Sequence, residues 1–347
     1  MKPHLISTVT LVLAIAVLSP SRAQGPIDIK PTAPQPGGSR AVADLMHYEA
    51  TGLSLLRPYE RGKIPVLLVH GLWSNPWSWE PMIAKLQAAG LGDRFQFWTF
   101  GYSTGDPIPY SAFLLRQNLD EVRRKVDPDG ADPTFAKMVV VGHSMGGLLA
   151  KMMSVESGTS LWRVFTDRPV DEAKGDPKDL ELFRRAMIFP ARSEVCRVVF
   201  IATPHRGSHL DRGPFHNVGT RLVRVPTPLI AVHRRLVDHN APDFFKEHFR
   251  KALPSSIDQL EWESPLITGL RKLNVAPTIK AHSIIAVKPG PAIGAANSVR
   301  TDGLVTYDSA HLEGVLSEKV VSAGHLCQAS PDVISEVKRI LIEHAGP

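Results

Sequence analysis

The length, composition and charge of the chain describe a globular protein with a large core. Its 347 residues are 43% hydrophobic and 21% charged, which suits one large domain with an insertion or two domains. The formal net charge is only +6 and the basic residues are dispersed, so the composition excludes the concentrated basic stripe of a nucleic-acid-binding protein.

The first 23 residues have the pattern of a signal peptide. Lys2 supplies positive charge, residues 5–18 are apolar and uncharged, and Ser21-Arg-Ala23 forms a small-x-small cleavage site. The apolar run is short for a membrane span. The cleavage point lacks the cysteine that would be typical of a lipid-anchored lipoprotein. We therefore expect cleavage after residue 23 and export to the periplasm or the medium, with residues 24–60 forming an N-terminal arm.

From near Ile64 onward, short apolar runs alternate with longer helical patterns. This alternation is typical of parallel strands joined by crossover helices, and it predicts an α/β fold with helices on both faces of a mostly parallel sheet. Strands are predicted at 65–69, 94–102, 137–141, 196–202, 279–287 and 319–322. Helices are predicted at 81–89, 111–126, 147–157 and 331–343.

Two segments interrupt the alternation within the predicted domain 61–347. Residues 166–178 are rich in charge, Pro and Gly, which indicates an exposed excursion. Residues 204–277 contain apolar residues at helical spacing, so we expect a helical insertion there. Because it follows a strand, the insertion is predicted to cap the crevice at the carboxyl edge of the sheet.

The hexapeptide Gly142-His-Ser-Met-Gly-Gly147 carries the strongest chemical signal. It follows the apolar run 137–141 and opens a predicted helix, so Ser144 is expected on a sharp turn between strand and helix. Glycines at 142 and 146 permit close packing there. Ser144 is therefore the candidate nucleophile, although a strand-turn-helix with an incidental serine has the same pattern.

A serine nucleophile needs a histidine base, and His325 is the preferred candidate. It follows the predicted strand 319–322 and precedes the last helix, which places it at the same sheet edge as Ser144. A histidine that only caps or packs beside that helix is the structural alternative. His311 is the rival base, but no clear strand precedes it.

An acid must orient the histidine, and Asp302 in Thr301-Asp-Gly-Leu-Val305 is preferred. It lies between the strand 279–287 and His325, which gives the order serine, acid, histidine. Its carboxylate would accept the imidazole Nδ1 proton. A simple Asp-Gly turn is the structural alternative, and Asp308 is the rival acid. The gap between residues 287 and 302 is long for a tight turn from strand to acid.

A second strand end, Val66-Leu-Leu-Val-His-Gly-Leu-Trp73, supplies the remaining part of the candidate site. The backbone amides of Leu72 and Met145 are predicted to form an oxyanion hole. His70 is interpreted as a hydrogen-bonding support for this loop. The nearby tryptophans either line an acyl pocket or pack under the next helix; they are Trp73, Trp77 and Trp79.

The chain at this point resembles the serine hydrolases of the α/β-hydrolase fold, specifically exported esterases and triacylglycerol-lipase-like enzymes. The resemblance rests on five matching segments, which are His70-Gly71, Gly142–Gly147, Ala202-Thr-Pro-His-Arg-Gly-Ser208, Thr301–Val305 and Gly324-His325. It implies the α/β-hydrolase fold, a triad of Ser144, Asp302 and His325, and an oxyanion hole of Leu72 and Met145. Residues 203–208 resemble the strand-end segment that borders the site in lipase-like and GPI inositol deacylase-like members.

No cofactor or metal is expected. His205 and His209 have the i, i+4 spacing of metal ligands, but Pro204 and Gly207 disfavour a helix there. No P-loop or dinucleotide fingerprint is present. A disulfide between Cys196 and Cys327 is not expected, because the two are predicted at opposite ends of the sheet.

The sequence thus predicts a carboxylic-ester hydrolase of the exported compartment that acts on small-molecule or lipid esters, with transient contact at a lipid interface. The same residues would serve an acyltransferase or an amidase, since pocket walls select the acceptor and leaving group. A binding protein that has lost activity on this fold is the rival from another class. Oligomeric state has no signature in the sequence.

Overall fold

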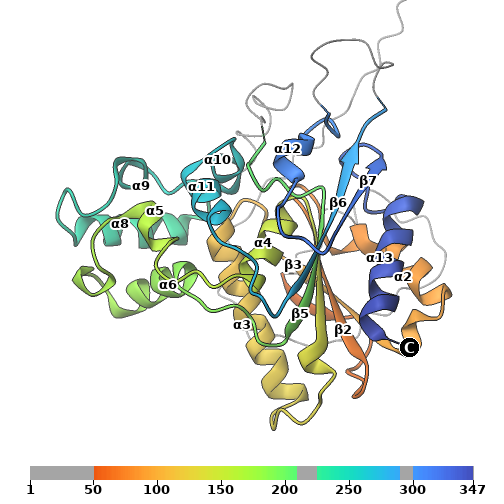
Figure 1. Ribbon diagram of the computed structural model, residues 1–347. Helices are drawn as coiled ribbons and strands as arrows, with labels where there is room; N and C mark the ends of the chain where they lie inside the picture. Colours follow the sequence, from red (N-terminus) through yellow and green to blue (C-terminus); the bar gives the residue numbers. More distant parts are fainter. Residues whose placement is uncertain (1–50, 209–224, 290–299, 347) are drawn as a thin grey trace, which may run out of the picture. The chain divides into compact units, whose positions relative to one another are not determined.

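A seven-stranded sheet forms the centre of the computed structural model, which describes residues 51–208, 225–289 and 300–346 (Figure 1). These residues belong to one unit of the chain. The strand order is β1-β3-β2-β4-β5-β6-β7. Only the β1–β3 pair is antiparallel, and all other neighbours are parallel. The strands are β1 (Gly52–Leu55), β2 (Ile64–Val69), β3 (Phe95–Gly101), β4 (Met138–His143), β5 (Val195–Ile201), β6 (Lys280–Val287) and β7 (Ser317–Ser322).

The central strands are covered on both faces, which is why their sequences are continuous apolar runs. Every residue of β2, β3 and β4 is buried. A parallel sheet in an α/β protein has helices on both sides, so its strands lose the alternation of apolar and polar residues. The predicted α/β fold with a mostly parallel sheet is confirmed.

Helices cover the sheet in two layers. α2 (Glu80–Ala88) and α13 (Pro331–Ala345) pack on one face, where Met82 and Val337 join the core. α3 (Ile108–Val126) and α4 (Met145–Ser154) pack on the other, through side chains such as Leu119 and Met152. These four helices correspond to the four predicted ones. Single-turn 3₁₀ helices lie at Pro76–Trp79, Leu91–Asp93, Phe135–Lys137 and Val170–Glu172.

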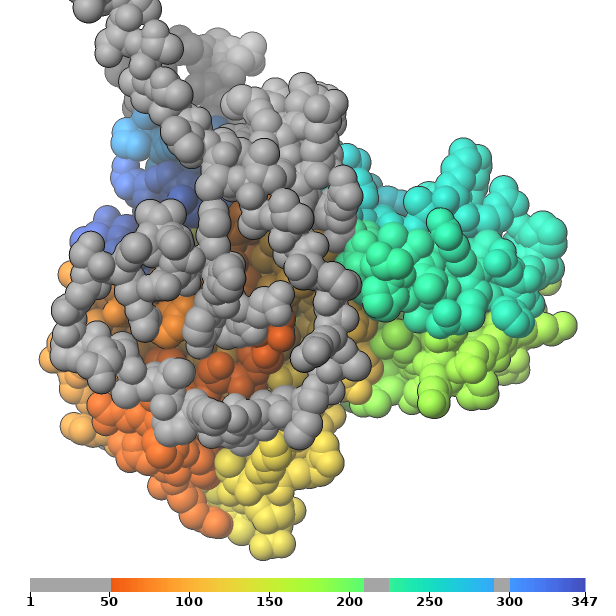
Figure 2. All heavy atoms as spheres, turned by 180° about the vertical axis from the view of Figure 1, so that it is seen from behind, coloured from red at the N-terminus to blue at the C-terminus, as the bar shows by residue number. Residues whose placement is uncertain are grey.

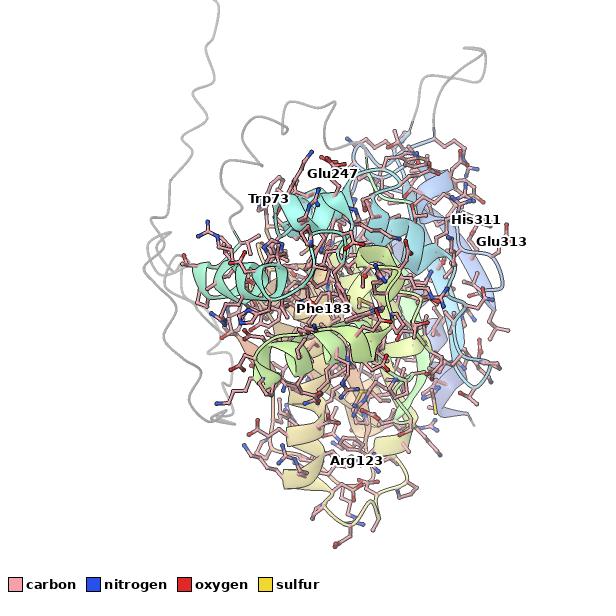
Figure 3. The ribbon with its side chains drawn as sticks, turned by 90° about the vertical axis from the view of Figure 1, so that its left-hand side faces the viewer. Trp73, Arg123, Phe183, Glu247, His311 and Glu313 are labelled. Carbon is pink, nitrogen blue, oxygen red and sulfur yellow. The ribbon has the colours of Figure 1, made fainter. Side chains whose placement is uncertain are left out.

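A helical lobe adjoins α3, built from two stretches that are far apart in the chain. One contributes α5 (Trp162–Phe165) and α6 (Pro177–Met187), the other α8 (Thr227–Asp238), α9 (Glu247–Lys251), α10 (Ser256–Leu260) and α11 (Pro265–Arg271). Figure 2 shows the two stretches as adjoining light green and teal surfaces. An aromatic cluster joins them, because the Phe183 ring stacks on that of Phe249 at 5.4 Å between centroids. Figure 3 labels Phe183.

The predicted insertion at 204–277 is therefore helical in its described part, and residues 209–224 lie outside that part. α6 was not predicted. It begins at the end of the excursion predicted at 166–178, most of which is exposed. The role of the insertion as a cap stays a prediction.

The strand β1, within the predicted N-terminal arm, has no counterpart among the predicted strands. It is only four residues long and begins with a glycine, so its own sequence has little strand character. Its backbone pairs with β3, and the side-chain amide of Asn118 accepts a bond from the amide of Leu53. The predicted signal peptide, 1–23, and arm residues 24–50 lie outside the described residues.

The amino ends of the strands are joined to α13 by a buried charged side chain. Arg197 of β5 donates to Glu343 at 2.9 Å and contacts His282 of β6 at 2.6 Å. The two cysteines, Cys196 and Cys327, are free. Among the described residues, no helix has the length and apolar character required to cross a membrane.

Candidate active site

Ser144 occupies a strained turn between β4 and α4. Its backbone has φ 54° and ψ −125°, a conformation that residues other than glycine rarely adopt. The flanking glycines are required by close packing: a Cβ on Gly142 would lie 2.5 Å from the carbonyl oxygen of Gly146, and one on Gly146 would collide with the backbone of Val69 and His70. The turn therefore holds the Ser144 side chain at the carboxyl edge of the sheet.

A continuous hydrogen-bond chain runs from Ser144 through His325 to Asp302. The Ser144 hydroxyl lies 2.8 Å from Nε2 of His325, and Nδ1 of His325 lies 2.7 Å from Oδ2 of Asp302. His325 lies on the loop between β7 and α13, and Asp302 on the loop after β6. Three loops at one edge of the sheet thus bring together residues that are up to 181 positions apart.

The Asp302 carboxylate is held from several sides. It is 1% exposed, and its Oδ1 accepts the amide hydrogens of Leu304 at 2.8 Å and Val305 at 2.7 Å. The backbone carbonyl oxygen of Asp302 accepts the amide hydrogen of His325 at 3.1 Å. Because Oδ1 is occupied by the backbone of its own loop, Oδ2 is left to face the imidazole.

The rival base and the rival acid are not part of the hydrogen-bond chain that joins Ser144, His325 and Asp302. His311 contacts Glu318 of β7 through Nδ1 at 2.6 Å and lies at the periphery of the described structure (Figure 3). Asp308 is exposed in the first turn of α12 (Tyr307–Ala310). The structure therefore brings His325 and Asp302 to Ser144, and neither His311 nor Asp308.

The candidate oxyanion loop passes directly beside the serine. A Cβ on Gly71 would lie 2.9 Å from the Cβ of Ser144, so the backbone of the loop is in van der Waals contact with the serine side chain. Met145 is the first residue of α4, where a helix presents unpaired amides. Within the described ranges, neither the Leu72 nor the Met145 amide donates a hydrogen bond to another protein group.

His70 supports its own loop. Its Nδ1 donates to the Gly71 carbonyl at 2.9 Å, and its ring stacks on Tyr102 at 4.5 Å. The Tyr102 hydroxyl in turn donates to the His70 carbonyl at 2.7 Å. Burial lowers the pKa of His70 to about 4, so the ring is neutral at neutral pH. These contacts agree with the interpretation of His70 as a support for the loop.

The sequence did not reveal one neighbour of the hydrogen-bond chain, His143. It is the last residue of β4, and its side chain reaches the backbone of His325: Nε2 lies 2.8 Å from the His325 carbonyl oxygen. Burial lowers the pKa of His143 to about 3. Its place in the hexapeptide was visible, but only the fold shows which loop its ring meets.

Two buried neutral histidines beside the site, His70 and His143, make folding pH-dependent. His70 and His143 have pKa values of about 4 and about 3 in the folded state and near 6.5 in the unfolded chain, so their stabilisation is complete above about pH 6.5. It is lost as the pH falls toward 4, because the unfolded chain binds protons that the folded state excludes. We expect the free energy of unfolding, measured by urea denaturation, to fall between pH 6.5 and 5 by on the order of 1 kcal/mol per pH unit for each histidine. His70→Gln should flatten the slope, and equal slopes for it and the wild type would contradict the assignment.

The remaining predicted elements divide between core and surface. Trp79, directly before α2, is fully buried in the same core cluster as Met82, which favours the packing interpretation, whereas Trp73 is 47% exposed. His205 is buried edge-on against Phe200, and His209 lies outside the described residues. In residues 51–208, 225–289 and 300–346 there is no group of three or more His, Cys, Asp or Glu that would hold a metal ion.

An apolar cavity of about 60 Å³ lies where α3 meets the helical lobe. Its lining is mainly apolar and comes from α3, α5, α6, α8, α9 and α10, with side chains that include Tyr110, Phe183, Val232, Leu236 and Phe249. The lobe therefore contains space for a small apolar group.

Comparison with known proteins identifies the family of the chain. The solved structures to which it is similar include a mature lipase of Bacillus licheniformis, with 14% identity over 81% of this chain and 93% of that chain and a TM-score of 0.45. Lipase 1 of Pelosinus fermentans has 13% identity over 83% and 100%, with a TM-score of 0.46. A thermophilic esterase of Thermogutta terrifontis has 14% identity over 82% and 92%, with a TM-score of 0.40. None of the curated proteins compared with the sequence matches it.

The model of the alpha/beta hydrolase family, by contrast, matches residues 66–337. This range contains six of the seven strands in part or whole, together with Ser144, Asp302 and His325. The chain therefore belongs to the alpha/beta hydrolase family.

Proposed function

We propose that the protein is a serine hydrolase that cleaves carboxylic esters. The observation that carries the proposal is the hydrogen-bond chain from Ser144 through His325 to Asp302, with distances of 2.8 Å and 2.7 Å. Nucleophile, base and orienting acid are recognised by this geometry rather than by their positions in a sequence. The strained backbone of Ser144 supports the proposal, because such conformations concentrate at functional sites.

In the proposed reaction, the Ser144 hydroxyl oxygen attacks the ester carbonyl carbon while its proton moves to Nε2 of His325. The tetrahedral intermediate collapses when the C–O bond to the alcohol breaks and His325 returns the proton to that alcohol. Water then attacks the acyl-enzyme, with His325 again taking and returning a proton, and releases the acid. Asp302 accepts the Nδ1 hydrogen throughout and stabilises the imidazolium.

The Leu72 and Met145 amides are the proposed oxyanion hole. Negative charge develops on the carbonyl oxygen during attack, and preorganised amides stabilise it without reorganisation. The Leu72 loop lies against Ser144, and the N-terminus of α4 adds a favourable dipole at Met145.

For the substrate we propose an ester with apolar groups, of the lipid or acyl-ester class. Apolar side chains adjoin the site residues along the chain: Trp73 follows Leu72 and is 47% exposed, and Leu326 follows His325 and is 77% exposed. Exposed apolar groups beside a reactive centre favour an apolar ligand or surface.

We also propose that the enzyme works outside the cytoplasm after cleavage behind Ala23. The support for this part is the charge and apolar pattern of residues 1–23 alone.

Labelling with a fluorophosphonate probe tests the proposed function, because such probes phosphonylate an activated serine. The wild-type protein should be labelled, and Ser144→Ala should lose the label entirely. Ser154→Ala is a matched control: Ser154 is buried on the same helix, but its hydroxyl donates to the carbonyl of Lys151. Labelling should persist in that variant. Folded wild-type protein that takes no label, or equal labelling of Ser144→Ala, would refute the proposal.

A further inference from the structure

His143 stands between the strand that carries the nucleophile and the loop that carries the base. It is the last residue of β4, is 2% exposed, and directly precedes Ser144. Its imidazole centroid lies 5.2 Å from that of His325, and its Nε2 lies 2.8 Å from the His325 carbonyl oxygen. One side chain thus connects the two loops that must approach each other for proton transfer.

The direction of this hydrogen bond follows from its acceptor. A carbonyl oxygen only accepts, so Nε2 of His143 carries the hydrogen and donates it. Burial first, and the neighbouring His325 second, lower the pKa of His143 to about 3, which leaves the ring neutral with Nδ1 unprotonated. Nδ1 faces the Gly71 backbone, where a Cβ on Gly71 would lie 3.2 Å away.

The other hydrogen bonds to the His325 backbone involve residues of the loops that follow β6 and β7. Its amide donates to the Asp302 carbonyl at 3.1 Å, and its carbonyl also accepts the amide of Cys327 at 2.9 Å. Neither of these two bonds connects His325 to β4, the strand that directly precedes Ser144. Among the described hydrogen bonds to the His325 backbone, the one from His143 ties it to β4.

We propose that His143 is a positioning residue, which sets the distance between Nε2 of His325 and Oγ of Ser144 by holding the His325 backbone against β4. The inference rests on the proposed function. Proton transfer is sensitive to placement, since a shift of about 1 Å costs up to about 100-fold in rate. A neutral donor suits this place, because a second positive charge would oppose the imidazolium that forms on His325.

Two replacements separate the hydrogen bond from packing. His143→Phe retains an aromatic ring of similar size without the donor. His143→Gln retains a donor at nearly the position of Nε2, because the Gln amide nitrogen is the same number of bonds from the backbone. A positioning role predicts that the His143→Phe variant reacts slowly and that the His143→Gln variant reacts at nearly the wild-type rate. A packing role predicts the reverse order of rates.

The experiment measures the rate constant for fluorophosphonate labelling, and kcat and KM for a nitrophenyl ester, with circular dichroism as a check on folding. His143→Phe should lower kcat and the labelling rate constant about 10- to 100-fold and leave KM within about twofold. His143→Gln should restore both rates to within about threefold of wild type. If Phe does not fold, His143→Leu takes its place as the variant without a donor.

The outcomes distinguish the two proposals. Absence of Ser144-dependent labelling in the wild type would contradict the proposed function. Normal wild-type labelling with a folded Phe or Leu variant of wild-type rate would overturn only the role of His143. Equal loss of rate in the Phe and Gln variants would also overturn it, because packing and not the donor would then be responsible.

Discussion

His325→Ala is expected to lower kcat/KM for ester hydrolysis by about 10⁴- to 10⁶-fold. Without the imidazole, the Ser144 hydroxyl has no group to take its proton, and its contact at 2.8 Å is lost. The fold should survive, because the bonds from His143 and Cys327 go to the backbone carbonyl, which alanine retains. Steady-state hydrolysis of nitrophenyl esters measures the loss.

The matched control is His311→Ala. His311 pairs with Glu318 at 2.6 Å, away from the serine, so its removal should change kcat/KM by about twofold or less. If His311→Ala were inactive and His325→Ala active, the proposed base would be the wrong residue.

Asp302→Asn is expected to lower kcat by about 10⁴-fold with little change in KM. The asparagine oxygen can still accept the amides of Leu304 and Val305, so the loop should keep its shape. The asparagine NH₂ would then face Nδ1 of His325, which favours the tautomer with the hydrogen on Nε2. In that tautomer Nε2 presents a donor to Ser144 and cannot take its proton.

Asp308→Asn is the control for this replacement. The side chain is exposed in the first turn of α12, and its neutralisation should leave kcat within about twofold of wild type. Loss of activity in Asp308→Asn, together with normal turnover in Asp302→Asn, would transfer the acid role to Asp308. Melting temperatures of both variants would show whether either change acts through the fold.

The central sheet was predictable because its signal is local. Runs such as 137–141 are continuously apolar since both faces of a parallel strand are covered, and the six predicted strands coincide with β2 to β7. β1 was missed because it owes its conformation to pairing with β3. α6 was missed for a related reason: it follows a segment rich in charge, Pro and Gly, and its apolar face is stabilised by Phe249 from a distant helix.

The candidate site divides in the same way. The sharp turn at Ser144 was predictable from the glycines around it, because the close packing there leaves no room for a Cβ at 142 or 146. His325 is preferred over His311 in the sequence because a predicted strand precedes it, and Asp302 is preferred because it lies between the strand 279–287 and His325. The structure adds the distances that join one histidine and one acid to the serine.

The sequence by itself determined the α/β class and the strand-turn-helix around Ser144, because each depends on residues close together in the chain. Only the tertiary structure decided which loops meet. The contact of His143 with the His325 carbonyl spans 182 positions, and the lobe joins Phe183 to Phe249. Such contacts depend on how strands and helices pack, and the free energy that selects one packing comes from the whole buried core rather than from any local pattern.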